Sequence, residues 1–277
     1  MMAIQNVDSH DDELIQFEAE GTSLPEPMEQ GFAENDGAQI WYATFGQGAP
    51  VILLHGGMGN SQNWGKQVPT LVENGYQVIV VDSRGQGRST RDAKPYSYEL
   101  MASDVLAVMD KLQVAQAGFV GWSDGACVAL ILGATVPARV VGVFFFACNM
   151  DPSGAKEFVF TPVIGRCLSR LQKDYQQLSQ TPEEFEAMAE ALGLMQRTQP
   201  NYSAHDLAQI RVPVTIVHSE HDEFIRREHA EYLARSIPGA KFIFLPGVSH
   251  FAPIQRPELF NAAVLEFLRL EGAKGKL

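Results

Sequence analysis

The sequence lacks the features that would mark a membrane protein, a disulfide scaffold or a metal-binding module. Its 277 residues contain no run of about 18 apolar residues, the length that a membrane-spanning helix needs, and the densest apolar stretch, at 140–148, has the length of a strand. Three cysteines, Cys127, Cys148 and Cys167, are too few and too scattered for a disulfide framework, and no Cys or His spacing typical of a metal site occurs. We therefore expect no metal and no membrane partner.

Positive charge is also scarce. The chain has 21 Lys and Arg against 33 Asp and Glu, which gives a formal net charge of −12. A protein that binds nucleic acid needs a basic surface facing the phosphates, and no segment supplies one. Nucleic acid is therefore not expected as a partner.

The acidic residues gather at the beginning of the chain, in residues 1–30. This segment holds eight of them and no Lys or Arg, and it ends in a Pro-Glu-Pro stretch. Acidic, weakly apolar segments bury too little surface to offset the entropy that ordering removes, so we expect a loosely ordered arm. The segment also lacks the basic and apolar regions of a secretory signal, which together with the few cysteines predicts a cytoplasmic protein.

From residue 31 onward, short apolar runs alternate with amphipathic segments of helix length. Asn35-Asp36-Gly37 separates two strand-like segments and accepts positive φ, which predicts a hairpin. Runs that are apolar on both faces and joined by helices indicate a mostly parallel sheet covered by helices, so the fold class is α/β. The apolar runs lie at 51–54, 78–81, 118–120, 140–147, 214–217 and 242–245, and the amphipathic segments at 64–73, 98–111, 123–136, 226–237 and 258–269.

The alternation breaks once, between Asn149 and His205. This stretch has no convincing strand but has two helical segments, at 156–177 and 182–192. Thr181-Pro182 is a typical helix start, because it offers a hydroxyl for the cap and a proline for the first helical position. We therefore expect a helical cap at 150–205, inserted into a core formed by 31–149 and 206–277.

The strongest chemical signal is a serine directly after the run at 118–120. Gly121-Trp122-Ser123-Asp124-Gly125 follows a predicted strand and opens a predicted helix, which is the setting of a nucleophile elbow. Such a turn strains the serine backbone and lifts the hydroxyl above the sheet, with glycines two residues to either side leaving room. Taken alone, the pattern fits an ordinary serine N-cap equally well.

Other motifs occur in the order that goes with such an elbow, and together they resemble the α/β-hydrolase family from about residue 31 to the end of the chain. His55-Gly56-Gly57-Met58 follows the first parallel run, and Asp-Ser-Arg-Gly-Gln-Gly-Arg-Ser at 82–89 follows the next. The resemblance implies an α/β-hydrolase fold with an inserted helical cap. It also implies that the backbone N–H groups of Gly57 and Asp124 form an oxyanion hole. The 82–89 turn lacks the third glycine and the Lys of a phosphate loop, so a structural role is expected there.

The resemblance further implies a catalytic triad, because a serine hydroxyl needs a base and the base needs an orienting acid. In the family the acid and then the histidine follow the nucleophile in the chain. His250, just after the last apolar run, is at the family's position for the base. Asp222 is the expected acid, in the loop after the preceding run. Ser219 stands where the family usually has glycine, which leaves Glu220 and Glu223 as alternative acids.

The residues next to the nucleophile indicate the substrate class. A serine rather than an aspartate implies acyl transfer to water through an acyl-enzyme. The Gly-Trp-Ser-Asp-Gly elbow resembles that of valacyclovir-hydrolase-like esterases, in which the acid after the serine binds the α-amino group of amino-acid esters. Enzymes similar to 3-oxoadipate enol-lactonases share the layout and need no amine, and Asp124 then only stabilises the helix start. Trp122 and Met58 are expected to line the pocket with Asp124.

The sequence thus predicts a serine hydrolase that acts without a cofactor on a small-molecule substrate, a carboxylic ester or a lactone. The same triad also serves C–C bond hydrolases, aminopeptidases and haloperoxidases, which remain alternatives. A non-enzymatic ligand binder on the same scaffold is a further alternative. An intact triad argues against the binder, because a receptor has no need for an acid that orients a histidine.

Overall fold

The computed structural model describes residues 12–272, and these contain one eight-stranded sheet. The strand order is β1-β2-β4-β3-β5-β6-β7-β8; the β1–β2 and β2–β4 pairs are antiparallel and the others parallel. This is the mostly parallel α/β arrangement that the sequence predicts. The strands are β1 (Glu29–Asn35), β2 (Ala38–Phe45), β3 (Ala49–Leu54), β4 (Tyr76–Val81), β5 (Ala117–Trp122), β6 (Val140–Phe146), β7 (Val214–His221) and β8 (Lys241–Ser249).

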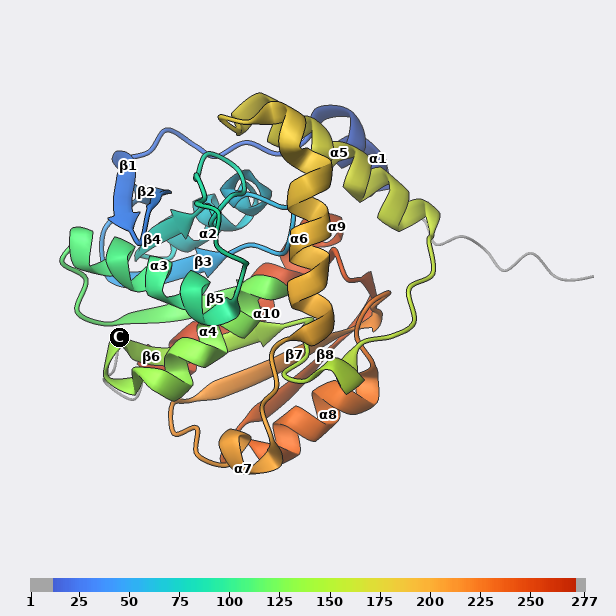
Figure 1. Cartoon of the computed structure of the whole chain (residues 1–277). Helices are drawn as coiled ribbons and strands as arrows, with labels where there is room; N and C mark the ends of the chain where they lie inside the picture. Colours follow the sequence, from blue (N-terminus) through green and yellow to red (C-terminus); the bar gives the residue numbers. More distant parts are fainter. Residues whose placement is uncertain (1–11, 273–277) are drawn as a thin grey trace, which may run out of the picture.

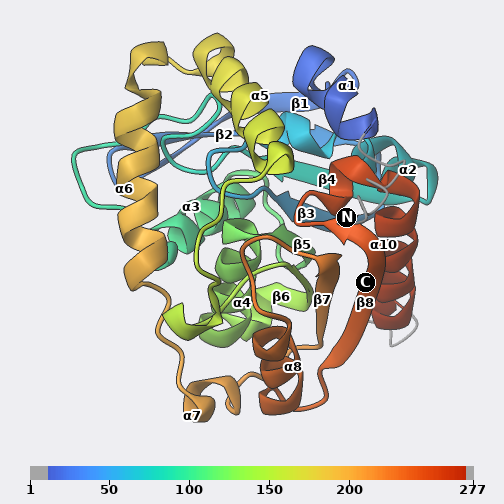
Figure 2. The same ribbon diagram turned by 90° about the vertical axis from the view of Figure 1, so that its right-hand side faces the viewer.

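Helices cover both faces of the sheet, and each face has its own apolar core (Figures 1 and 2). Neighbouring residues of a central strand point to opposite faces, so Ile52 contributes to one core and Leu53 to the other, and both are fully buried. This burial on both sides explains the continuous apolar runs. One face carries α3 (Tyr98–Lys111), α4 (Asp124–Thr135) and α8 (Arg227–Ser236), and the other α2 (Gln67–Glu73), α9 (Ala252–Gln255) and α10 (Pro257–Gly272).

The chain between β6 and β7 forms a helical cap. Its two long helices are α5 (Pro162–Leu178) and α6 (Phe185–Thr198), and the short α7 (Ala204–Leu207) precedes β7. α5 begins with a Thr161 side-chain cap and a proline, whereas Thr181-Pro182 starts only a short 3₁₀ turn that leads into α6. In Figure 1 the two helices lie on the same side of the molecule, with α6 crossing in front of the sheet.

The N-terminal arm is more ordered than its composition predicts. Residues 1–11 lie outside the described range, but α1 (Asp12–Glu20) packs against α5 and α9 (Figure 1). Leu14 and Phe17, one helical turn apart, are buried in the second core. The prediction of a loosely ordered arm is therefore wrong for the helix at residues 12–20. The average composition of residues 1–30 concealed two apolar side chains, Leu14 and Phe17, that lie on the same face of one helix.

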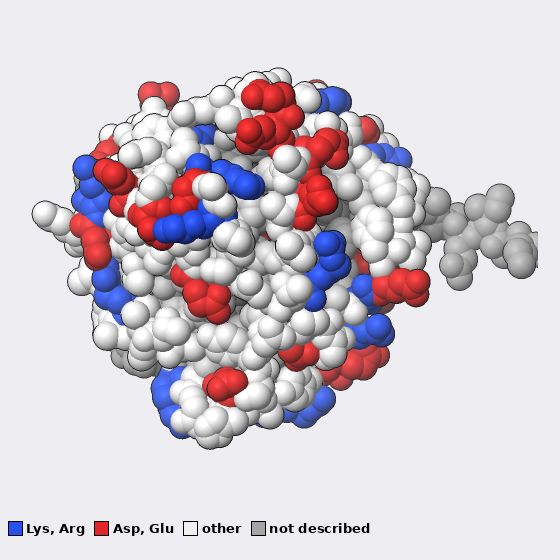
Figure 3. Space-filling model, in the orientation of Figure 1, with Lys and Arg blue, Asp and Glu red and all other residues white. Residues whose placement is uncertain are grey.

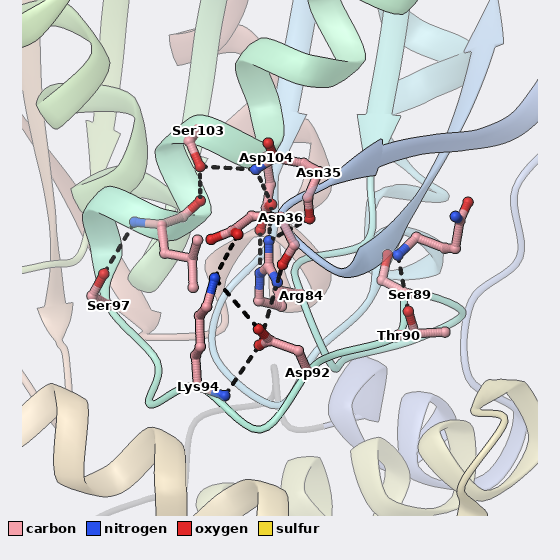
Figure 4. A network of polar contacts seen from close by, with 12 residues as sticks. Asn35, Asp36, Arg84, Ser89, Thr90, Asp92, Lys94, Ser97, Ser103 and Asp104 are labelled. Carbon is pink, nitrogen blue, oxygen red and sulfur yellow. Dashed lines mark hydrogen bonds and ion pairs between the residues drawn. The ribbon is translucent and has the colours of Figure 1, made fainter.

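The turn at 82–89 has a structural role. Arg84 is only 1 % exposed, and its guanidinium contacts the Asp104 carboxylate at 2.5 and 2.9 Å. The same group donates to the backbone oxygens of Asn35 and Asp36, as Figure 4 shows. The turn thereby ties the β1–β2 hairpin to α3 through hydrogen bonds that the buried guanidinium donates to acceptors of the chain.

The surface carries charges of both signs and has no basic patch on the face that Figure 3 shows. On the face seen in Figure 3, Lys and Arg side chains are interspersed with Asp and Glu. Within residues 12–272, no helix is long and apolar enough to cross a membrane. In the same range, no group of three or more His, Cys, Asp or Glu side chains is arranged to hold a metal ion.

The docking of α1 predicts a large effect of one side chain on stability. Phe17→Ala is expected to lower the free energy of unfolding by about 3 kcal/mol, because it removes a buried aromatic ring from the core. Ile15 lies on the same helix but is 48 % exposed, so Ile15→Ala should change it by less than about 0.5 kcal/mol. Urea unfolding of both variants measures the difference, and equal values would contradict the docked position of α1.

Candidate active site

Ser123 occupies a strained turn between β5 and α4. Its backbone has φ 53° and ψ −124°, a region that residues other than glycine rarely adopt. The turn is held by hydrogen bonds from the Ser123 N–H to the Phe146 oxygen at 2.9 Å and from the Ala126 N–H to the Ser123 oxygen at 2.8 Å. These contacts maintain the strain, and the serine side chain lines a cavity.

Two glycines allow the turn because no side chain fits at their positions. A Cβ atom on Gly125 would lie 2.1 Å from the backbone oxygen of Leu54, at the end of β3. A Cβ atom on Gly121 would lie 2.4 Å from the Cα atom of Ala126. The Gly-x-Ser-x-Gly pattern therefore follows from the packing of α4 against β3 and β5.

Asp222 and His250 follow β7 and β8, which are neighbouring parallel strands, so both residues lie at the same edge of the sheet. The His250 Nδ1 atom is 3.0 and 3.2 Å from the two carboxylate oxygens of Asp222. The backbone N–H groups of Phe224 and Ile225 also donate to this carboxylate, at 2.9 and 2.8 Å. These bonds hold the buried carboxylate in a fixed orientation toward the imidazole.

The electrostatics of this pair favour the charged forms. Burial tends to raise the pKa of Asp222, but the neighbouring His250 and the hydrogen bonds outweigh it and leave that pKa below its usual value. Burial tends to lower the pKa of His250, but the Asp222 carboxylate outweighs it and leaves that pKa above its usual value. The imidazole is thus a stronger base than an isolated histidine would be.

The two alternative acids have other partners. The Glu220 carboxylate accepts a hydrogen bond from the Gly247 N–H at 2.8 Å, and the Glu223 carboxylate accepts one from the backbone N–H of His250 at 2.9 Å. Neither contacts the imidazole ring through a hydrogen bond within the described residues. Asp222 is therefore the acid that faces His250, while Glu223 holds the histidine by its backbone.

Ser123 and His250 both line a cavity of about 480 Å³ between the core and the cap. This volume is in the range of small-molecule sites. Met58, Trp122 and Asp124, which the sequence places at the pocket, also line it, as does Gly57. The cap contributes the opposite wall through Leu168 and Leu171 of α5 and Gly193, Gln196 and Arg197 of α6.

Gly57 and Asp124 lie next to each other, close to Ser123. A Cβ atom on Gly57 would lie 2.5 Å from the Asp124 Oδ2 atom, and one on Gly56 would lie 3.2 Å from the Ser123 Cβ atom. Asp124 is the first residue of α4, so its backbone N–H has no acceptor within the helix. Both positions suit the oxyanion-hole roles that the family resemblance implies.

Two residues that sequence reasoning missed hold the Asp124 side chain. The Tyr98 hydroxyl donates to one carboxylate oxygen at 2.8 Å, and the Gln196 side-chain amide donates to the other at 3.0 Å. Burial raises the pKa of Asp124, and the two donors oppose that rise. Tyr98 begins α3 and Gln196 lies on α6, so neither belongs to a motif that the sequence reveals.

A third missed residue connects the cap to the acid loop. The Lys156 ammonium donates to the backbone oxygen of Asp222 at 2.5 Å, and its backbone N–H donates to the Phe224 oxygen at 2.7 Å. Ala155 and Ile225 form a β-bridge beside these bonds. The beginning of the cap is therefore attached directly to the loop that carries Asp222.

Comparison with known families supports this description. The model of the Alpha/beta hydrolase family matches residues 51–263. The matched range includes the elbow, both strands that precede Asp222 and His250, and the whole cap.

Similar proteins carry several related activities in their names. A protein of Synechocystis sp. named "Putative non-heme chloroperoxidase" is 28 % identical over 262 residues, covering 83 % of this chain and 95 % of the relative. The serine hydrolase BPHL of Mus musculus is 26 % identical over 248 residues, covering 84 % of each chain. The solved structure of Est816, an N-acyl homoserine lactone degrading enzyme, is 28 % identical with a TM-score of 0.69, covering 85 % of this chain and 99 % of the other.

The contacts of Asp124 predict a specific role for the Tyr98 hydroxyl. Tyr98→Phe is expected to lower the free energy of unfolding by about 2 kcal/mol, since a buried carboxylate loses one of its two donors. Tyr96 is also buried, but its hydroxyl donates to no carboxylate within residues 12–272, so Tyr96→Phe should cost less than about 1 kcal/mol. Urea denaturation compares the two variants. A larger loss for Tyr96→Phe would contradict the importance of the Tyr98 contact.

Proposed function

The chain belongs to the α/β-hydrolase family, and we propose that it is a serine hydrolase that cleaves a small carboxylic ester or a lactone through an acyl-enzyme. The observation that carries the proposal is the grouping of Ser123, His250 and Asp222 at one end of the sheet, with Ser123 and His250 facing one cavity. The relatives named as a serine hydrolase and as a lactone-degrading enzyme support the same substrate class.

In the first half of the proposed reaction, Ser123 attacks the carbonyl carbon of the substrate while His250 accepts its proton. Asp222 holds the imidazole in the required tautomer and stabilises the imidazolium that forms. The backbone N–H groups of Gly57 and Asp124 donate to the oxyanion, and the loss of one such donor typically lowers kcat by about 10²–10³-fold. Collapse of the tetrahedral intermediate transfers the proton from His250 to the leaving oxygen, which in a lactone remains attached to the acyl group.

In the second half, a water molecule attacks the acyl-enzyme. His250 accepts the proton of the water, and the same two N–H groups stabilise the second oxyanion. Departure of the Ser123 oxygen, which regains a proton from His250, releases the carboxylic acid. Each step uses groups of this chain and water only.

The proposal predicts how activity depends on pH. His250 accepts a proton only when neutral, and its raised pKa means that activity is lost as the pH falls through a value above about 6.5. In Asp222→Asn the carboxylate that raises the pKa of His250 most is gone while burial still lowers it, so this acid limb should move to lower pH. kcat should also fall by roughly 10⁴-fold, because the imidazole loses its orienting partner. Stopped assays of p-nitrophenyl ester hydrolysis between about pH 5 and 8 measure both effects.

Two variants control this experiment. Glu220→Gln should keep nearly full activity, because that carboxylate bonds to Gly247 and not to the imidazole. Ser123→Ala should reduce hydrolysis to the background rate and should not form an acyl-enzyme detectable by mass spectrometry. Near-normal kcat in Asp222→Asn together with an inactive Glu220→Gln would overturn the assignment of the acid. A flat pH profile for the native chain would overturn the role of His250.

A second, narrower candidate is the hydrolysis of esters that carry an amino group. Asp124 lines the cavity and is 5 % exposed, and no Lys or Arg of the described chain forms an ion pair with it. A buried carboxylate is costly without a positive partner, and Tyr98 and Gln196 supply hydrogen bonds but no charge. An ammonium group of the substrate would supply that charge. The elbow's resemblance to valacyclovir-hydrolase-like esterases points in the same direction.

A pair of matched substrates distinguishes the two candidates. The p-nitrophenyl esters of alanine and of propanoic acid differ only in the amino group. If Asp124 binds the ammonium, kcat/KM should favour the alanine ester by more than about tenfold, equivalent to about 1.4 kcal/mol, and Asp124→Asn should remove the preference. Ser123→Ala corrects for spontaneous hydrolysis. Equal rates for both esters would contradict the amine site and leave neutral esters and lactones as the substrates.

A further inference from the structure

Two of the three cysteines meet behind the nucleophile. Cys127 lies in the first turn of α4, three residues after Asp124, and Cys148 lies shortly after the end of β6. Their Sγ atoms are 2.9 Å apart. The pair therefore joins the helix that carries the elbow to the segment that follows the neighbouring strand.

The two thiols differ in their surroundings. The Cys127 thiol donates to the backbone oxygen of Asn149 at 3.0 Å, which leaves its sulfur free to accept the Cys148 proton. Cys127 is fully buried and does not line the cavity, and burial raises the pKa of its thiol well above the usual value. Cys148 does line the cavity that also holds Ser123. A small solute that enters the cavity thus reaches Cys148 first and Cys127 only through it.

We propose that Cys127 and Cys148 are a modification site, a thiol pair that a hydroperoxide of the size of hydrogen peroxide converts into a disulfide in the wall of the cavity. Two features together support this proposal. The two sulfurs are in contact, and one of them, that of Cys148, belongs to a residue that lines a cavity which a small oxidant can enter. The site is distinct from the proposed hydrolytic chemistry, since neither sulfur belongs to the triad.

The reaction has two balanced steps. The Cys148 thiol first gives its proton to solvent; the thiolate attacks one oxygen of hydrogen peroxide, the O–O bond breaks, and a sulfenic acid forms while the released hydroxide takes up a proton to become water. The Cys127 sulfur then attacks the Cys148 sulfur, the S–O bond breaks, and the departing hydroxide takes the Cys127 thiol proton, so that water leaves as the S–S bond forms. The overall change oxidises two thiols to a disulfide and reduces one peroxide to two waters, with no other reactant. A bond needs the sulfurs about 2.0 Å apart, so they must approach by less than 1 Å from their present separation.

The bond would link groups that shape the proposed substrate site. Asp124 and Cys127 are three residues apart in one helix and so lie on the same side of it. Tyr98, which donates to Asp124, is near enough to both cysteines that their charges would raise its pKa further. Oxidation therefore fixes the first turn of α4 against the segment at 147–149, next to the Asp124 carboxylate.

The thiols can be counted directly in the full chain. We would treat it with hydrogen peroxide at a dose that oxidises free cysteine in the same solution, then denature and alkylate it and measure its mass. Alkylated cysteines should fall from three to one, and fragment mapping should join the peptides that contain Cys127 and Cys148. Dithiothreitol should restore all three. Three alkylated cysteines after peroxide, or a disulfide that includes Cys167, would overturn the proposal.

Single variants test the order of the two steps. Cys127→Ser should stop at the Cys148 sulfenic acid, which dimedone traps, whereas Cys148→Ser should give neither the trapped adduct nor the disulfide. Cys167→Ser is the matched control and should still form the bond. Oxidation of Cys148 to sulfinic acid in the native chain while Cys127 stays alkylatable would refute the pairing. Because every readout is a mass, the result does not depend on whether the chain hydrolyses esters.

Discussion

The close approach of α4 to the end of β3 is the contact on which the site depends. The Leu54 oxygen lies where a side chain on Gly125 would have to be, so the helix can begin there only with a glycine. That contact, together with the one at Gly121, forces Ser123 into its positive φ and directs the side chain toward the cavity. The strain costs of order 1–3 kcal/mol locally, and the apolar cores on both faces of the sheet offset it. The position of the serine in the cavity wall is thus a consequence of backbone packing rather than of a side-chain hydrogen bond that a substitution could remove.

Parallel pairing explains why four separate chain segments meet at this position. β3, β5, β7 and β8 run in the same direction, so the residues that follow them gather at one edge of the sheet. Gly57 follows β3, Ser123 follows β5, and Asp222 and His250 follow β7 and β8. The distance along the chain between these residues is irrelevant to the site, because the sheet supplies their proximity. The hairpin network around Arg84 (Figure 4) lies outside this set and secures the antiparallel end of the sheet.

The fold could be predicted because it depends on local signals, and the resemblance to the α/β-hydrolase family implied that Asp222 orients His250. Apolar runs mark the strands. The elbow, the acid loop and the histidine each lie directly after such a run, where a short motif is enough to identify the residue. The other features depend on contacts between distant segments. Tyr98 and Gln196 approach Asp124 from α3 and from the cap, and Lys156 reaches Asp222 across 66 residues, so no spacing in the sequence reveals them. The prediction for the N-terminal arm failed for a related reason: its composition is that of a solvated segment, while Leu14 and Phe17 are buried against distant parts of the chain.

These distant contacts make the cap part of the proposed catalytic machinery as well as the wall of the pocket. Gln196 of α6 donates to the side-chain carboxylate of Asp124, and the backbone N–H of the same residue is a proposed oxyanion donor. Lys156 and the Ala155–Ile225 bridge hold the loop that carries Asp222. A shift of the cap would therefore move the elements beside both Ser123 and His250. Because a misplacement of about 1 Å can cost a hundredfold in rate, substitutions in the cap should alter kcat along with substrate preference. If the proposed function holds, these two sets of hydrogen bonds couple specificity to turnover, because both join the cap to residues that line the same cavity or hold His250.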